Sequence, residues 1–146
     1  MRVLGLDYGG KTIGVAVSDP LLITALGLEV IRRPGEAEIR NSIRRLKEII
    51  REYSVGIIVL GYPKNLDGTE SSRCKLTREF KDRLGRNFKN VEIHLWDERF
   101  TSVSAEKELA SLGLNQKKIG ALSDITAAVF ILQGFLDNYR MGTKCE

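Results

Sequence analysis

The stretch GLDYGGKT, from Gly5 to Thr12, decides the fold of this chain, because two interpretations of it exclude each other. It satisfies the P-loop pattern G-x-x-x-x-G-K-[S/T], in which a strand leads through a phosphate-binding loop into a helix. The residues that follow, IGVAVS, are rich in β-branched side chains and favour a second strand instead. A carboxylate at Asp7 would also repel the phosphates of a nucleotide. We therefore interpret the stretch as a β-hairpin whose first strand ends near Asp7.

Length and composition bound the class of protein. The chain has 146 residues, 42% hydrophobic and 29% charged, which is typical of a single globular domain spanning residues 1–146. No apolar run approaches the ~20 residues of a membrane-spanning helix, and we expect neither a signal peptide nor a membrane partner. The two cysteines, Cys74 and Cys145, make a poor disulfide or metal framework. These features predict a protein of the reducing cytoplasm.

Hydrophobic periodicity predicts the element order β-β-β-α-β-α-β-α-α. Strands are expected at residues 2–7, 12–19, 24–31, 55–60 and 91–96, and helices at 36–53, at 70–85, after Thr101 or Ser102, and at 123–139. The first three strands, joined by tight turns, should be antiparallel, whereas strands separated by helices should be parallel crossovers. The predicted fold is α/β, a mixed five-stranded sheet with helices on both faces.

Acidic residues gather where the predicted strands end. Asp7 ends the first strand, Asp97 and Glu98 follow the fifth, and Asp67 lies in the loop after the fourth. Because ligands of α/β sheets bind at the carboxyl ends of the strands, these acids are candidate site residues. The single histidine, His94, lies within a strand, so we expect it to be structural and find no Ser-His-Asp arrangement.

Asp124 is a further candidate from the last predicted helix. It precedes Ala127, Ala128 and Ile131 at spacings of three, four and seven residues, so its carboxylate falls on the core-facing stripe. The ordinary alternative is a helix cap, since the prediction places it in the first turn. Carboxylates without cysteine or histidine favour Mg²⁺ or Mn²⁺, and two such ions can clamp a phosphodiester during hydrolysis.

The basic residues are concentrated in two segments. The net charge is +4 and the isoelectric point is about 9.2, which is compatible with a polyanionic partner. Arg40, Arg44, Lys47 and Arg51 recur at helical spacing in one narrow stripe. The ordinary alternative is a solvated helix face, but the stripe is available to backbone phosphates. The second basic segment contains Arg73, Lys75, Arg78, Lys81, Arg83, Arg86 and Lys89.

Four segments together resemble a known family. They are DYGGKTIGVA from Asp7 with Ser18-Asp19, Gly61-Tyr62-Pro63 with Gly68, Asp97-Glu98-Arg99-Phe100-Thr101, and Asp124 with Ala127-Ala128 and Ile131-Leu132-Gln133. In their order and spacing they resemble the YqgF-type proteins of the ribonuclease H-like superfamily. These proteins were first described as Holliday junction resolvases and later assigned to maturation of the 16S ribosomal RNA precursor. The resemblance implies a ribonuclease H-like fold and a metal-dependent nuclease in the cytoplasm.

The resemblance also implies roles for individual residues. Asp7, Glu98 and Asp124 match the family's metal-binding, catalytic acids, with Mg²⁺ or Mn²⁺ as the cofactor. Lys11, Arg99 and Thr101 match polar positions near the scissile phosphate. Two departures concern substrate contacts: Ser102 stands where a second threonine is common, and the segment before Asp124 is less basic than usual.

Several functions remain open at this point. The substrate of a nuclease would be 16S rRNA precursor, alone or within a ribosomal particle, or a four-way DNA junction. The chain contains no long heptad pattern, so we expect a monomer or a weak homodimer. A non-catalytic nucleic-acid-binding protein and an ATP-binding protein of the actin and sugar-kinase superfamily are the alternatives. The latter needs two such domains around its nucleotide.

Overall fold

The computed structural model describes residues 1–32, 39–65, 67–97 and 116–145, and within the last helix the side chains of residues 125–139. The elements are β1 (Arg2–Tyr8), β2 (Thr12–Ser18), β3 (Ala25–Arg32), α1 (Ile39–Tyr53), β4 (Val55–Tyr62), α2 (Ser72–Asn87), β5 (Glu92–Asp97) and α4 (Gln116–Cys145). The predicted strands and the helices at 36–53, 70–85 and 123–139 are thus present, with shifted ends. The helix predicted after Thr101 or Ser102, and residues 36–38 of the first helix, lie outside the described residues.

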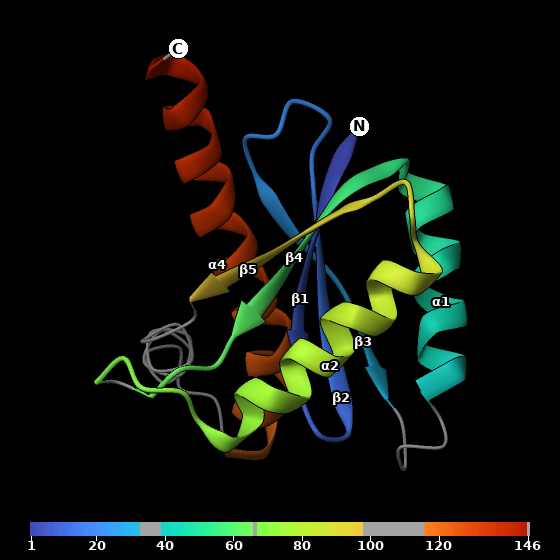
Figure 1. Cartoon of the computed structure of the whole chain (residues 1–146), viewed down its shortest axis with the longest axis vertical. Coiled ribbons are helices and arrows are strands. Elements are labelled where there is room, and N and C mark those ends of the chain that lie inside the picture. Colours follow the sequence, from blue (N-terminus) through green and yellow to red (C-terminus); the bar gives the residue numbers. More distant parts are fainter. Residues whose placement is uncertain (33–38, 66, 98–115, 146) are drawn as a thin grey trace.

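The strands form the mixed sheet that the sequence predicts. Their order is β3-β2-β1-β4-β5. The pairs β1–β2 and β2–β3 are antiparallel, whereas β4 is parallel to both β1 and β5. The carboxyl ends of β1, β4 and β5 consequently point to one end of the molecule, where the described part of α4 also begins (Figure 1).

The hairpin interpretation of the opening stretch is confirmed. Asp7 pairs with Gly14 across the β1–β2 ladder, and Tyr8 pairs with Ile13. The turn is closed by a hydrogen bond of 2.8 Å from the Gly9 N–H to the Thr12 carbonyl. Strand β2, and not a helix, follows Lys11, so the stretch lacks the helix N-terminus on which a P-loop depends.

Two hydrophobic cores lie on opposite faces of the sheet. One core packs α1 and α2 against side chains such as Leu4, Leu6 and Ile58. The other packs α4 against Val3, Val59 and their neighbours. Figure 1 shows α2 crossing in front of the sheet and α4 behind it. Within the described residues, no helix combines the length and the apolarity needed to cross a bilayer.

Two details of the helix predictions are wrong. The last helix begins at Gln116, so Asp124 lies about two turns inside it and cannot act as its cap. In α2, the spacing of Leu76, Phe80 and Leu84 predicts one apolar stripe, but Leu76 is 46% exposed. The buried face of α2 is instead completed by Cys74 and Thr77. The Thr77 hydroxyl is satisfied by donating to the Arg73 carbonyl at 2.9 Å, which allows a polar side chain to be buried there.

Helix α4 approaches the backbone of the sheet closely at two glycines. A Cβ atom added to Gly5 in β1 would lie 2.6 Å from the Leu132 Cβ and 3.1 Å from the Ala128 carbonyl oxygen. A Cβ at Gly27 in β3 would lie 2.6 Å from the Ile125 Cγ2. These separations are shorter than van der Waals contact, so the helix lies this close only because glycine occupies both positions.

We expect Gly5→Ala to destabilise the protein by about 1–3 kcal/mol, the usual cost of overpacking a well-packed core. The measurement is chemical denaturation followed by circular dichroism. Gly10→Ala is the matched control, because a Cβ at Gly10 would meet nothing within 4 Å. Equal stability of the two variants would contradict the close packing of α4.

Candidate active site

The alternation of side chains along β1 places Asp7 on the α4 face of the sheet. Leu4 and Leu6 belong to the core under α1 and α2, whereas Val3 belongs to the core under α4. Gly5 also contacts α4, so Asp7, two residues further along the strand, faces the same way. Asp7 is partly buried and takes part in a polar interaction of its own.

The direction of α4 is fixed by its contacts with β3. The side chain of Gln133 accepts a hydrogen bond from the Ala25 N–H and donates one to the Ile23 carbonyl, both at 2.9 Å. Ile125 lies further along β3, at Gly27. Since β3 runs in the same direction as β1, α4 runs antiparallel to both. Its earlier residues therefore lie toward the carboxyl end of β1.

This direction brings the backbone of Asp124 toward the end of the sheet where Asp7 lies. Gly5 lies against both Ala128 and Leu132, and Asp124 precedes Ala128 by about one helical turn. Asp7 follows Gly5 by two strand residues. Both acids therefore lie beyond Gly5 in the same direction, on the same face of the sheet. The burial of Ala127, Ala128 and Ile131 confirms the predicted core-facing stripe, although the side chain of Asp124 itself lies outside the described residues.

Glycines flank Asp7 on both sides of this face. Gly14 is its partner in β2. In β4, Gly61 follows Leu60, the residue that pairs with Leu6, and so lies level with Asp7. Gly14 and Gly61 share the alternation of Ala16 and Val59, which belong to the α4 core. At these two positions the neighbouring strands therefore place no side chain beside Asp7.

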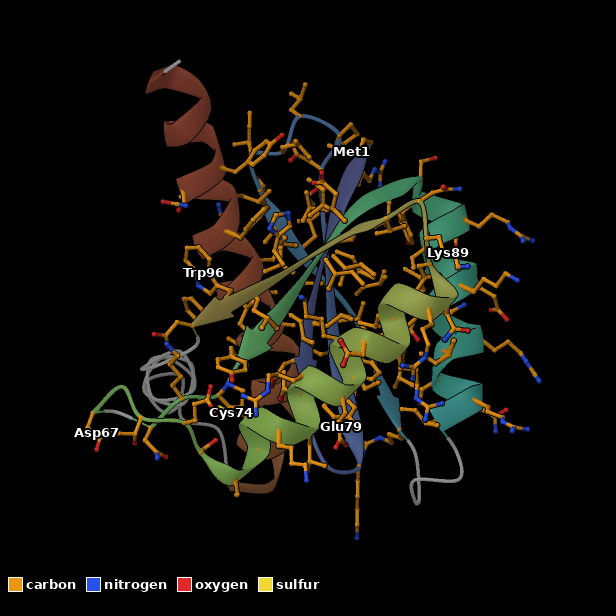
Figure 2. The ribbon with its side chains drawn as sticks, viewed as in Figure 1. Met1, Asp67, Cys74, Glu79, Lys89 and Trp96 are labelled. Atoms are coloured by element: carbon orange, nitrogen blue, oxygen red, sulfur yellow. The ribbon has the colours of Figure 1, made fainter. Side chains whose placement is uncertain are left out.

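Strand β5 ends at the same level, one strand beyond β4. Gly61 pairs with Trp96, and Tyr62 pairs with Asp97. Trp96 faces α4, where its ring meets Gly134 and packs edge-on against Phe135 at 6.3 Å between centroids (Figure 2). The alternation directs Asp97 to the opposite face, away from Asp7. Asp97 is thus a weaker candidate ligand than its position in the sequence suggests.

Other predicted site residues lie outside the described part of the chain. They are Glu98, Arg99 and Thr101, together with the side chain of Asp124. Among the side chains that the structure describes, no three acids, histidines or cysteines converge to hold a metal ion. Asp67 serves its own loop, since its Oδ1 accepts hydrogen bonds from the Thr69 N–H and hydroxyl at 2.9 and 2.6 Å.

The predicted basic residues are separated by the sheet. Lys11 is exposed in the β1–β2 turn, at the same edge as Asp7. The stripe on α1 lies on the other side, because α1 packs against the core opposite α4. All four members of the stripe are exposed, namely Arg40, Arg44, Lys47 and Arg51. Figure 2 shows nitrogen-tipped side chains of α1 pointing away from the sheet.

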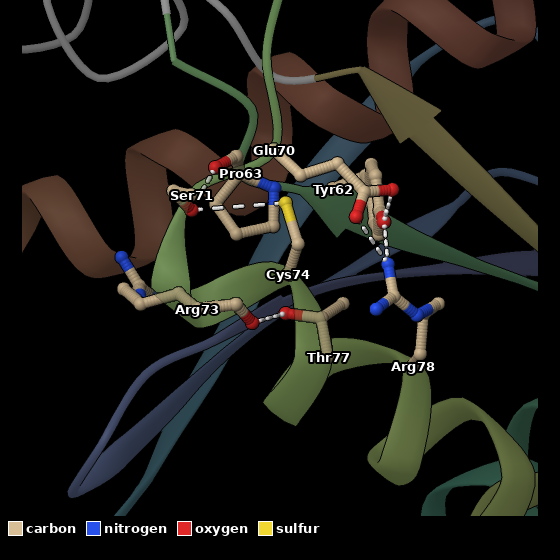
Figure 3. A network of polar contacts seen from close by, with 8 residues as sticks. All are labelled: Tyr62, Pro63, Glu70, Ser71, Arg73, Cys74, Thr77 and Arg78. Atoms are coloured by element: carbon tan, nitrogen blue, oxygen red, sulfur yellow. Dashed lines mark hydrogen bonds and ion pairs between the residues drawn. The ribbon is translucent and has the colours of Figure 1, made fainter.

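A polar network that the sequence patterns did not reveal fixes the loop after β4 (Figure 3). The Tyr62 hydroxyl donates to the Glu70 Oε1 at 2.7 Å, and the Arg78 guanidinium donates to the Glu70 Oε2 at 2.9 Å. Arg78 also donates to the Tyr62 hydroxyl. The Tyr62 hydrogen bond, followed by that of Arg78, lowers the pKa of Glu70 below its ordinary value. The loop is thereby held at the carboxyl end of β4.

A second contact ties α2 to the hairpin that carries Asp7. The Arg73 guanidinium donates a hydrogen bond of 2.7 Å to the carbonyl of Tyr8. The Ser71 hydroxyl, just before the helix, donates to the Pro63 carbonyl. The Arg73 contact joins residues 65 positions apart, so the sequence showed only the charge of Arg73 and not its partner. The two contacts tie the beginning of α2 to the end of β1 and to the turn after β4.

The fold and the acid at the end of β1 define the class of the protein. The chain has the fold of *Thermus thermophilus* RuvC bound to a Holliday junction, with a TM-score of 0.61, 20% identity and coverage of 98% of this chain and 97% of that one. This likeness establishes a ribonuclease H-like architecture.

The sequence comparisons identify the family. Residues 1–138 match the RuvX family, described as Holliday junction resolvase. The chain is 50% identical over 137 residues to a protein of *Agathobacter rectalis*, covering 94% of this chain and 95% of that one. It is 45% identical over 138 residues to a protein of *Bacillus subtilis*, covering 94% and 99%. Both relatives are named "Putative pre-16S rRNA nuclease". The chain belongs to the RuvX family, and this is a family of nucleases, which hydrolyse phosphodiester bonds.

We expect the Glu70 network to stabilise the protein only where Glu70 is ionised. Its pKa is lowered in the folded state, so its contribution is present above the ordinary pKa of about 4.3 and is lost as the pH falls through the lowered value. Urea denaturation at pH 7 should therefore find Glu70→Gln less stable than the parent protein. The difference should shrink as the pH falls below the ordinary pKa and through the lowered one.

Glu52→Gln, which removes an exposed glutamate of α1 outside this network, is the control. A pH-independent effect of Glu70→Gln would show that the charge of Glu70 has no part in holding the loop.

Proposed function

We propose that this chain is a divalent-metal-dependent nuclease of the cytoplasm that cleaves the 16S ribosomal RNA precursor. The observation that carries the proposal is the position of Asp7 between Gly14 and Gly61, on the face of the sheet that α4 covers. The names of the relatives support the choice of substrate. An acid flanked by glycines on the neighbouring strands suits a site where a phosphodiester must approach.

The proposed metal ligands are Asp7, Glu98 and Asp124. All three are carboxylates, whose oxygens are hard donors, so the donor set fits Mg²⁺ or Mn²⁺. Glu98 directly follows Asp97, the last residue of β5. When bound, the metal would supply a nucleophilic water and stabilise the charge on the leaving oxygen.

The chain's own residues would position the substrate. Lys11, in the turn after Asp7, is placed to bind a phosphate next to the cleaved bond, and we assign Arg99 and Thr101 to the same neighbourhood. Arg73 holds the Tyr8 carbonyl and so limits movement of the strand end that carries Asp7. Preorganised charges of this kind lower the cost of reorganisation during the reaction.

The stripe of Arg40, Arg44, Lys47 and Arg51 has a separate role in this proposal. It lies on the face opposite Asp7, so it contacts a part of the nucleic acid away from the cleaved bond. Phosphate contacts of this type orient a substrate without reading its sequence. A large structured RNA, which can surround the edge of the sheet, would reach both faces.

A four-way DNA junction is the second candidate substrate. The description of the family favours it. A resolvase cuts two strands symmetrically, which requires two active sites and hence a dimer. Cleavage of rRNA requires only one active site. The oligomeric state in solution and the cleavage products therefore distinguish the two candidate substrates.

We expect Asp7→Asn to abolish cleavage while binding is retained or strengthened, because a negative charge leaves the site. Cleavage of a labelled 16S precursor fragment with Mg²⁺, with Mn²⁺ and with EDTA is the measurement, and gel mobility reports binding. Asp82→Asn removes an exposed carboxylate of α2 and should cleave normally. Cleavage by Asp7→Asn, or in EDTA, would overturn the metal-site assignment.

The substrate is tested with a four-way DNA junction run beside the RNA fragment. Metal-dependent cleavage of the RNA alone is the expected result. Symmetric nicking of the junction alone, with a dimer in sedimentation, would replace the rRNA proposal by the resolvase. Calorimetry with ATP should detect no binding, since β2 follows the P-loop-like stretch.

A further inference from the structure

A groove lies between α1 and α2, on the face of the sheet opposite Asp7. Its volume is about 310 Å³, within the range of ligand pockets. The rings of Tyr8 and Phe80 stack at the base, with centroids 4.1 Å apart and an interplanar angle of 9°. Ile39, at the beginning of α1, and Leu76, which is 46% exposed, add apolar surface. The exposure of Leu76, which contradicted the predicted stripe, thus contributes to this groove.

The rim of the groove is charged and mostly cationic. Arg83 and Arg86 line it from successive turns of α2, and Glu79 lies one turn before Arg83. Figure 2 shows Glu79 on α2, in front of the sheet. A phosphate would be attracted to the end with the two arginines and repelled at the Glu79 end. The Glu79 carboxylate can instead accept a hydrogen bond from an amino group of a base.

The charge of the whole layer around the groove is complementary to a polyanion. Helix α1 carries five basic and two acidic residues, and α2 carries six basic and two acidic residues. Their combined net charge is +7, whereas the whole chain has +4, so the remainder of the chain has a net charge of −3. Because this charge extends beyond the groove along α1, it fits a polymer better than a free nucleotide.

The groove is connected to the candidate active site through adjacent residues of β1. Tyr8 follows Asp7 directly, and the alternation of the strand directs their side chains to opposite faces. Both lie at the carboxyl end of β1, beside the turn formed by Gly9 and Gly10. A nucleic-acid strand that passes around this turn can therefore present one phosphodiester to Asp7 and a neighbouring nucleotide to Tyr8.

We propose that the α1–α2 groove binds one unpaired nucleotide of the nucleic-acid substrate, with its base against Tyr8 and its phosphate at Arg83 and Arg86. The substrate class rests on the proposed function, and the groove narrows it to substrates with a single-stranded segment next to the cleaved bond. An unpaired base is required, because a base within a duplex has both faces covered by its neighbours.

The first test uses 2-aminopurine, whose fluorescence is quenched by stacking, at successive positions of a 16S precursor hairpin with a single-stranded extension. Binding is measured in EDTA. We expect quenching at one position of the extension, retained in Tyr8→Phe and lost in Tyr8→Leu. The absence of quenching at every position in the unmodified protein would overturn the proposal.

A second test changes an arginine at the rim of the groove, so it does not depend on whether the Tyr8 variants fold. We expect Arg83→Ala to weaken binding of the extended hairpin about tenfold, and to reduce the salt slope by about 0.7, the value of one single-strand phosphate contact. Binding of the same hairpin without its extension should hardly change. Lys75→Ala removes an equal charge from an exposed position of α2 outside the groove, and should not discriminate between the two hairpins. Equal behaviour of Arg83→Ala and Lys75→Ala would overturn the assignment of Arg83.

The tests distinguish an error in the assignment of the groove from an error in the proposed function. Metal-dependent cleavage without selective loss in Arg83→Ala means that the nuclease stands and the groove does not. Selective loss of binding in Arg83→Ala, with no cleavage by the parent protein, supports the groove and contradicts the nuclease proposal.

Discussion

The close contact between α4 and the glycines of the sheet is the constraint on which the candidate site depends. Gly5 and Gly27 allow the helix to lie directly on the backbone of β1 and β3. Gln133 fixes its position along β3 through two hydrogen bonds. Because a helix is rigid over several turns, these contacts also determine how far Asp124 lies along the sheet. The position of Asp124 along the sheet is therefore set by the packing of the residues that follow it in α4.

The end of β1 carries one residue of the candidate active site and one residue of the α1–α2 groove. Asp7 faces α4 and lies between Gly14 and Gly61, whereas Tyr8 faces α2 and stacks on Phe80. Arg73 binds the carbonyl of Tyr8 and thereby restrains both side chains at once. A change in the position of this strand end would alter the proposed metal site and the groove together.

Most of the architecture could be predicted from the sequence, because it depends on local patterns. The periodicity of apolar residues gave the strands, and the β-branched run after Thr12 distinguished a hairpin from a P-loop. The predictions failed where tertiary contacts determine the burial of a side chain or the point at which a helix begins. Leu76 has the spacing of a buried residue but lies beside a groove, and Asp124 was assigned to a first turn although the helix begins earlier. The Tyr62–Glu70 hydrogen bond closes an irregular loop, and the Arg73–Tyr8 hydrogen bond joins residues 65 positions apart, so no periodic spacing indicates either. The face on which the α1 stripe lies likewise required the sheet topology.

The concentration of positive charge in α1 and α2 gives one side of the sheet a strong electrostatic potential. The two helices together carry a net charge of +7, whereas the whole chain has +4. A polyanion is attracted to this side, so encounters begin with the helical layer and not with the carboxylates. Association would then be fast and sensitive to ionic strength, while the acids approach the backbone only after the protein is already oriented. Long-range electrostatic attraction of the nucleic acid to α1 and α2 thus precedes its short-range contact with the carboxyl ends of the strands.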